Sequence, residues 1–337
     1  MTKFEQKQKL EASNYICNLF LKSMQKNRKF ERVVFTTLGL LGFALFQACT
    51  TQQNANQKEY VVCTTNIIAD VVKVVLPRDI KVISLMGEGV DPHLYKAGQK
   101  DLEYLQQAKV IVENGLHLEG KMAEVLIKLQ RYKTVVRMSD GVDEAKLIKI
   151  SDDIYDPHIW FDVQLWSNSV AHMAKEMTKV YPERSEEIRS NQKRFAARLE
   201  SLNAVVKETM GNVDVNQRVL VTAHDAFSYF GKAYDTEVRG LQGISTQSEF
   251  GLKDVSDLVN YLVDRKIPAV FVETSVSEKS IRAVVEGCEK RGHQVNIGGK
   301  LYSDALGGKN EEGNTYINMV STNVETIANA LNTKGDE

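Results

Sequence analysis

The feature of this 337-residue chain that most limits its fold is one long helical pattern between two stretches of alternating strands and helices. From Pro182 to Met210 the apolar residues recur at spacings of 7, 4, 3 and 4, with charges between them, at Ile188, Phe195, Leu199, Leu202 and Val206. Such spacing gives a helix a single apolar stripe, and proline suits a first helical position. The pattern predicts a long helix that connects two separate regions.

On each side of this helix, β-rich runs alternate with helical patterns. Before it we expect strands at residues 59–65, 79–85 and 108–113 and helices at 67–76, 99–107, 120–130 and 163–180. After it we expect strands at 218–223, 238–241, 269–273 and 294–297. This order is typical of parallel sheets with helices on both faces. The sequence therefore predicts an α/β fold of two Rossmann-like lobes, joined by one rigid helix that keeps lobe motion small.

The expected limits are 59–181 for the N-terminal lobe, 182–213 for the linking helix and 214–337 for the C-terminal lobe. A content of 43% apolar and 26% charged residues is typical of globular domains. The formal net charge of -1 lacks the basic excess of nucleic-acid binders, so we expect no nucleic-acid partner. After residue 50 no apolar run is long enough to indicate a polytopic membrane protein.

The N-terminus has the pattern of a targeting segment. Basic residues precede an apolar run at 33–46, which is shorter than a membrane span and typical of a signal peptide. We expect residues 1–48 to be this segment, with 1–23 lying ahead of a natural start at Met24. Ala48-Cys49 resembles a bacterial lipoprotein box, which predicts lipid attachment at Cys49 and a polar tether at 49–58. The alternative is an ordinary secretory signal with a chance cysteine.

The tripeptide Asp-Pro-His occurs twice, at 91–93 and 156–158, and His224 and Asp304 follow further strand-like runs. Open α/β sheets bind ligands beyond the carboxyl ends of their strands. We therefore expect four side chains, two from each lobe, to meet in the cleft between the lobes: His93, His158, His224 and Asp304. Three imidazoles and a carboxylate suit a first-row divalent metal. The proline stiffens each turn and extends the preceding aspartate.

Four further residues are expected to support this site. Asp91 and Asp156 would orient the imidazoles, since a metal-bound histidine usually donates its other N–H to an oxygen. His117 would support a ligand or pack beside the cleft. Glu273, at a strand end, would either reach the cleft or form a salt bridge between the lobes.

The competing class is a zinc hydrolase, in which three histidines leave a position open for water and Asp304 acts as the base. The sequence contains neither a His-Glu-x-x-His nor a Gly-x-Ser-x-Gly motif, so we favour a closed four-ligand site and no enzymatic activity. A surface adhesin on the same fold is a third class. Imidazoles favour zinc, whereas a carboxylate that binds through both oxygens favours manganese.

Five segments resemble, in the same order, signatures of the TroA-like solute-binding lipoproteins of zinc and manganese ABC transporters: residues 91–95, 114–119, 156–162, 223–227 and 302–307. The resemblance runs from about Tyr60 to Ala330. It implies that the family's ligands fall on the four predicted donors and that its long helix falls on residues 182–210. Gln247 and Phe250 stand where an acidic residue and a proline are usual, and no His-rich loop is present.

The resemblance also implies a function. The chain would be an extracytoplasmic receptor, lipid-anchored to a bacterial membrane in the periplasm or on the outer face of the cell membrane. It would bind one zinc or manganese ion as cargo and deliver it, as a monomer, to an ABC transporter permease and its ATPase.

Overall fold

The computed structural model describes residue 22 and residues 60–248 and 250–332. The predicted signal peptide, Cys49 and the tether lie outside these described residues. Within the described ranges, the helices are all too short or too polar to cross a membrane.

The N-terminal lobe contains a four-stranded parallel sheet in the order β2-β1-β3-β4. Its strands are β1 (Tyr60–Cys63), β2 (Lys81–Ser84), β3 (Val110–Glu113) and β4 (Thr134–Arg137). The central strands β1 and β3 are buried along their whole length, as expected for a parallel sheet that is covered on both faces. The first three strands were predicted. The sequence analysis missed β4.

Helices cover both faces of this sheet. Val61 and Cys63 of β1 share an apolar cluster with α2 (Asn66–Val75), whereas Tyr60 and Val62 face the cluster of α3 (Gln99–Gln107) and α4 (Ala123–Leu129). The alternation of β1 side chains between the two clusters follows from the two-residue period of a strand. The predicted helix at 120–130 begins as a 3-10 turn, Gly120–Met122, before α4.

The C-terminal lobe repeats the strand order of the first. The parallel pairs are β7 (Val219–His224) with β8 (Glu237–Gln242) and β9 (Ala269–Glu273) with β10 (Asn296–Leu301). Strand β7 lies beside β9, so the order of neighbours is β8-β7-β9-β10. The helices of this lobe are α7 (Ser228–Tyr234), α8 (Leu252–Arg265) and α9 (Lys279–Glu289). The prediction for 294–297 ended too early, because β10 continues to Leu301 and leads directly toward Asp304.

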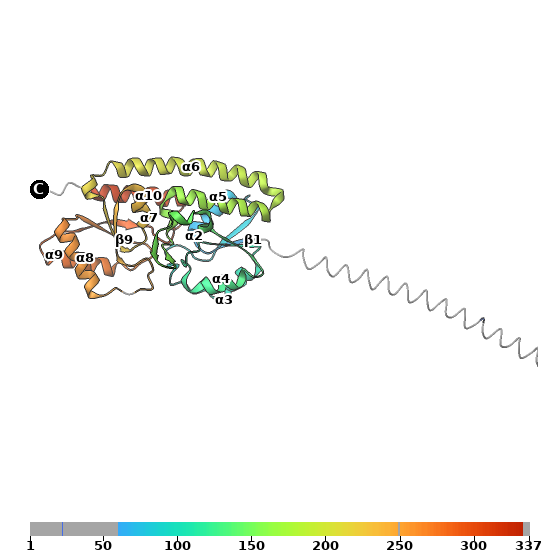
Figure 1. Cartoon of the computed structure of the whole chain (residues 1–337), viewed down its shortest axis with the longest axis horizontal. Helices are drawn as coiled ribbons and strands as arrows, with labels where there is room; N and C mark the ends of the chain where they lie inside the picture. The colour runs from blue at the N-terminus through green and yellow to red at the C-terminus, as the bar shows by residue number, and fades with distance from the viewer. Residues whose placement is uncertain (1–21, 23–59, 249, 333–337) are drawn as a thin grey trace, which may run out of the picture. The chain divides into compact units, whose positions relative to one another are not determined.

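A layer of helices lies over both lobes (Figure 1). It contains α5 (Val163–Val180), α6 (Ser185–Gly211) and α10 (Tyr316–Leu331). Helix α6 has 27 residues and is about 40 Å long. Its predicted stripe is buried against α2, α5 and α10, and one apolar cluster includes residues of both lobes. The linking helix therefore packs against both lobes along its length, which explains why it can act as a rigid connector.

The predicted lobe limits stay a prediction, because the described residues from Tyr60 onward belong to one compact unit. A short antiparallel hairpin, β5 (Lys149–Ser151) with β6 (Ile154–Tyr155), directly precedes the second Asp-Pro-His. The remaining short elements are 3-10 helices at Met138–Gly141, Glu144–Lys146, Ile159–Phe161, Pro182–Arg184 and Val215–Gln217.

Candidate metal centre

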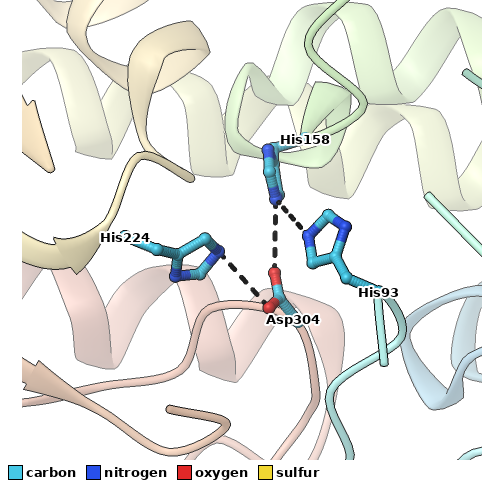
Figure 2. Close-up of side chains that lie close together, drawn as sticks. All are labelled: His93, His158, His224 and Asp304. Carbon is cyan, nitrogen blue, oxygen red and sulfur yellow. Dashed lines mark hydrogen bonds and ion pairs between the residues drawn. The ribbon is translucent and has the colours of Figure 1, made fainter. Parts of the chain in front are cut away.

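Four buried side chains meet where the two lobes face each other (Figure 2). His93 lies in the turn after β2, and His158 directly precedes the 3-10 helix Ile159–Phe161. His224 is the last residue of β7, and Asp304 follows β10. Two of the four precede α6 in the chain and two follow it, as the sequence analysis expected.

The spacing of the four side chains is that of ligands around one ion. Nε2 of His158 lies 3.3 Å from Nε2 of His93 and 3.5 Å from Oδ1 of Asp304. Nε2 of His224 lies 3.4 Å from Oδ2 of Asp304. One ligand atom from each residue lies within 4.8 Å of all the others. A tetrahedral zinc ion with bonds of about 2.0–2.1 Å sets its ligand atoms about 3.3 Å apart.

Two of these atoms lack a hydrogen bond among the described residues. Nε2 of His224 and Oδ1 of Asp304 are buried and make only the ion-pair contacts given above. A buried polar atom without a hydrogen bond is costly and is rare in folded proteins. A cation between the four side chains would satisfy both atoms.

Two of the three imidazoles contact a carboxylate through Nδ1, the ring nitrogen that faces away from the cluster. Asp156 Oδ1 lies 2.7 Å from Nδ1 of His158 and accepts a hydrogen bond from the same residue's backbone N–H at 2.9 Å. Glu273 Oε2 lies 2.6 Å from Nδ1 of His224, and Oε1 accepts the backbone N–H of His224 at 2.9 Å. Each carboxylate fixes both ring and backbone of its histidine, so Nε2 points inward. Glu273 therefore contacts a histidine of its own lobe, and of the two predictions for it the salt bridge between lobes is wrong.

Asp91 differs from the expectation, and His117 lies beside the cleft. Asp91 accepts hydrogen bonds from the backbone N–H of His93 at 2.8 Å and from the Thr246 hydroxyl at 2.6 Å. It thus supports the backbone of His93 rather than its imidazole. His117 is exposed, has a left-handed backbone with φ of 63°, and lines a cleft of about 450 Å³ that reaches His93. It lies outside the four-residue cluster.

The proton affinities of the N-terminal imidazoles diverge. Burial lowers the pKa of His93 to about 3, against the opposing attraction of Asp304. Burial also acts to lower the pKa of His158, but the charges and hydrogen bonds of Asp156 and Asp304 outweigh it and raise the pKa to about 9. The difference follows from the carboxylate that contacts one ring and not the other.

The C-terminal donors form a coupled ion pair. Burial opposes the charged form of His224, but Glu273 and Asp304 raise its pKa well above the usual value. Burial likewise opposes ionisation of Asp304, but His224 and His158 hold its pKa well below the usual value. These shifts favour the protonated forms of His158 and His224 at neutral pH. A metal held by the two imidazoles would displace both protons.

Several contacts that position the donors were not predicted. The Asn114 side-chain amide donates to the carbonyl of Pro157 at 2.9 Å, and the Tyr229 hydroxyl donates to the carbonyl of Asp156 at 3.0 Å. The Trp160 indole N–H donates to the carbonyl of Ser303 at 3.1 Å. Each contact joins segments that lie far apart in the chain. No local pattern marks them, so only the folded structure shows them.

Glu119 supports one of these contacts. It is buried, and its Oε1 accepts the backbone N–H of Asn114 at 2.7 Å and the Thr64 hydroxyl at 2.8 Å. Burial raises the pKa of Glu119 to about 7, and the negative charge of Glu113 adds to the shift. Glu119 thus holds Asn114 in place, and Asn114 in turn holds the loop of His158.

Residues 61–330 match the family model described as "Zinc-uptake complex component A periplasmic". The chain belongs to this family. The manganese-binding lipoprotein MntA of Bacillus subtilis is 44% identical over 300 residues, which cover 89% of this chain and 97% of MntA. The zinc-binding protein TroA of Treponema pallidum is 42% identical over 277 residues, 82% of this chain and 90% of TroA.

A solved structure supports the same membership in the zinc-uptake component A family. The periplasmic zinc-binding protein TroA from Treponema pallidum superimposes with a TM-score of 0.79 at 42% identity, over 81% of this chain and 98% of that chain. This match confirms the predicted α/β fold of two lobes and one long helix. The family consists of binding components of metal transport and not of enzymes, so the zinc hydrolase alternative is set aside.

Proposed function

We propose that this protein captures a single zinc or manganese ion outside the cytoplasm and delivers it to an ABC transporter permease and its ATPase. The observation that carries the proposal is the convergence of four buried side chains, His93, His158, His224 and Asp304. His158 lies 3.3 Å from His93 and 3.5 Å from Asp304, and His224 lies 3.4 Å from Asp304. All four donors come from one chain, so we propose that the protein acts as a monomer. The names of the two relatives, one manganese-binding and one zinc-binding, support a metal as cargo.

The choice between zinc and manganese depends on more than the donor atoms. The two relatives have similar identities of 44% and 42% and are named for different metals. At a site of three imidazoles and one carboxylate, the intrinsic affinity order favours zinc over manganese. We propose that the site accepts both ions and that supply decides which one is carried.

The metal content of protein recovered from cells tests this proposal. We expect one zinc or manganese ion per chain by mass spectrometry, in a ratio that follows the metals supplied in the medium. His158→Ala should lose most of the ion, because it removes the donor that contacts both His93 and Asp304. Full occupancy in this variant, or wild-type protein without metal under zinc-rich and manganese-rich conditions, would contradict the proposal.

We also propose that Cys49 is lipidated and anchors the protein, since MntA is named as a lipoprotein. Acyl chains contribute roughly 0.8 kcal/mol per buried methylene, and stable attachment needs more than one signal. Cys49→Ala should therefore move the protein from the membrane fraction to the soluble fraction while metal binding stays unchanged. Immunoblots of the two fractions measure this. A variant that stays with the membrane would show that something other than Cys49 holds it there.

A further inference from the structure

The loop after β8 reaches across the cleft to His93. We infer that Thr246 and Gln247 form a latch, defined here as these two side chains, that positions His93 on the metal and slows release of the ion. The inference rests on the proposed function, because it assumes that His93 is a metal ligand. Thr246 and Gln247 would be positioning residues that act through His93 and do not touch the ion.

The latch holds the backbone of His93 on both sides. Nε2 of Gln247 donates a hydrogen bond to the carbonyl of His93 at 2.7 Å. The Thr246 hydroxyl donates to Oδ2 of Asp91 at 2.6 Å, and Oδ1 of Asp91 accepts the N–H of His93 at 2.8 Å. The N–H and the carbonyl of His93 are therefore both tied to a loop of the opposite lobe.

The other two imidazoles do not depend on the opposite lobe in this way. Asp156 fixes the ring of His158, and Glu273 fixes the ring of His224, each from within its own lobe. Among the described contacts of His93, no carboxylate reaches its Nδ1. Its imidazole is thus placed through its backbone. Separation of the two lobes at the latch would release His93 while the rings of His158 and His224 keep their carboxylate partners.

The latch lies at the mouth of the site. Of the four donors, only His93 lines the cleft of about 450 Å³, and Gln247 lines the same cleft. An ion that leaves through this cleft must pass His93. Gly120 packs directly against the hydrogen bond between Gln247 and His93, and its φ is 35°. A Cβ added at this position would lie 2.4 Å from the carbonyl oxygen of His93 and 2.5 Å from Nε2 of Gln247. Glycine leaves the room that the latch needs.

The loop is also anchored beside a second donor. Nε2 of Gln242 donates to the carbonyl of Thr246 at 2.9 Å. Gln242 is the last residue of β8 and pairs with His224 of β7 in the sheet. The latch therefore connects His93 to the strand end that carries His224.

Two substitutions test the latch with little change in shape. Gln247→Glu keeps the side-chain length and removes the N–H donor, and Thr246→Val keeps the branching and removes the hydroxyl. Each is expected to speed zinc dissociation into excess chelator by about 3- to 10-fold, the change that corresponds to loss of one hydrogen bond. Gln247 is exposed and Thr246 is half-buried, so both variants should fold.

A control separates positioning from general loosening of the lobes. Asp70 of α2 accepts the backbone N–H of Tyr316 of α10 at 2.9 Å, a bond between lobes that touches none of the four donors. Asp70→Ala should lower the melting temperature but change zinc dissociation less than twofold. The visible spectrum of bound Co²⁺ gives a second readout, because displacement of the His93 imidazole should shift the absorption of both latch variants away from that of the wild type. A role in stability alone would leave that spectrum unchanged.

The outcomes distinguish the latch from the proposed function. Suppose that both latch variants have the dissociation rate and the Co²⁺ spectrum of the wild type, while His93→Ala loses its metal. This result would overturn the latch and leave the proposed function intact. Equal acceleration in Asp70→Ala would overturn the positioning role. If His93→Ala itself binds zinc normally, the proposed function fails along with the latch.

Discussion

His93→Ala is expected to weaken zinc binding by more than about 100-fold and to leave the metal-free protein as stable as the wild type. Loss of a residue that only supports a metal ligand costs about 10- to 100-fold in affinity, and loss of the ligand itself should cost more. The ring of His93 contacts His158 at 3.3 Å and pairs with no carboxylate among the described residues. Its removal therefore leaves no buried negative charge without a partner.

His224→Ala should behave differently in the metal-free protein. Its loss leaves Glu273 and Asp304, both buried, without the imidazole that contacts them at 2.6 and 3.4 Å. Removing one partner of a buried ion pair costs about 3–5 kcal/mol. We expect loss of zinc binding together with a lower melting temperature.

Calorimetric titration and thermal unfolding of the two variants measure both effects, with His172→Ala on α5 as the matched histidine control. Normal zinc affinity in His93→Ala would contradict its assignment as a donor. A metal-free melting temperature that is equally low in His93→Ala and His224→Ala would contradict the role given to Glu273.

Several helices up to the end of α6 could be predicted from the sequence because apolar residues recur in them with a helical period. Helix α3 has the predicted limits, and α6 begins and ends within a few residues of its prediction. The prediction for β10 was too short because two glycines, Gly298 and Gly299, interrupt its apolar run. The β5–β6 hairpin was missed because its strands are very short and mostly exposed.

The four residues of the candidate site could be proposed from the sequence because each lies near a strand end or in a stiff turn. The contacts that hold these residues in place could not be predicted from the sequence. Glu273 had two open roles until the strand order placed β9 beside β7. Thr246 and Gln247 contact residues about 155 positions earlier in the chain, and no local pattern encodes such a contact. The sequence thus predicts which side chains could bind a metal, and the tertiary structure shows what holds them in place.

Zinc binding is expected to release about two protons per chain between pH 7 and 8. In the metal-free protein His158, with a pKa of about 9, and His224, with a raised pKa, are protonated in this range, whereas His93 is already neutral with a pKa of about 3. Bound imidazoles must be neutral, so protons compete with the metal. Affinity should therefore fall about 100-fold for each pH unit of acidification here.

The raised pKa values decide how the stability of the metal-free protein changes with pH. In the metal-free fold, the ion pairs of His158 and His224 contribute stability that is complete below the unfolded pKa of about 6.5. That stability is lost as the pH rises through the raised folded pKa of each histidine, which is about 9 for His158. The stability that bound zinc adds changes with pH in the opposite direction, because fewer protons compete with the metal at higher pH. The zinc-induced rise in melting temperature should therefore be larger at pH 7.5 than at pH 5. If all three imidazoles had unperturbed pKa values, they would already be neutral at pH 8, and zinc binding would release almost no protons there.

Titration calorimetry in buffers of different ionisation enthalpy counts the released protons. Asp156→Asn is the matched variant, because it removes the carboxylate charge that raises the pKa of His158 and should reduce the count by about one. Proton release near zero at pH 8 in the wild type would show that its imidazoles are already neutral there. The carboxylates behind the rings would then orient the donors without holding protons on them.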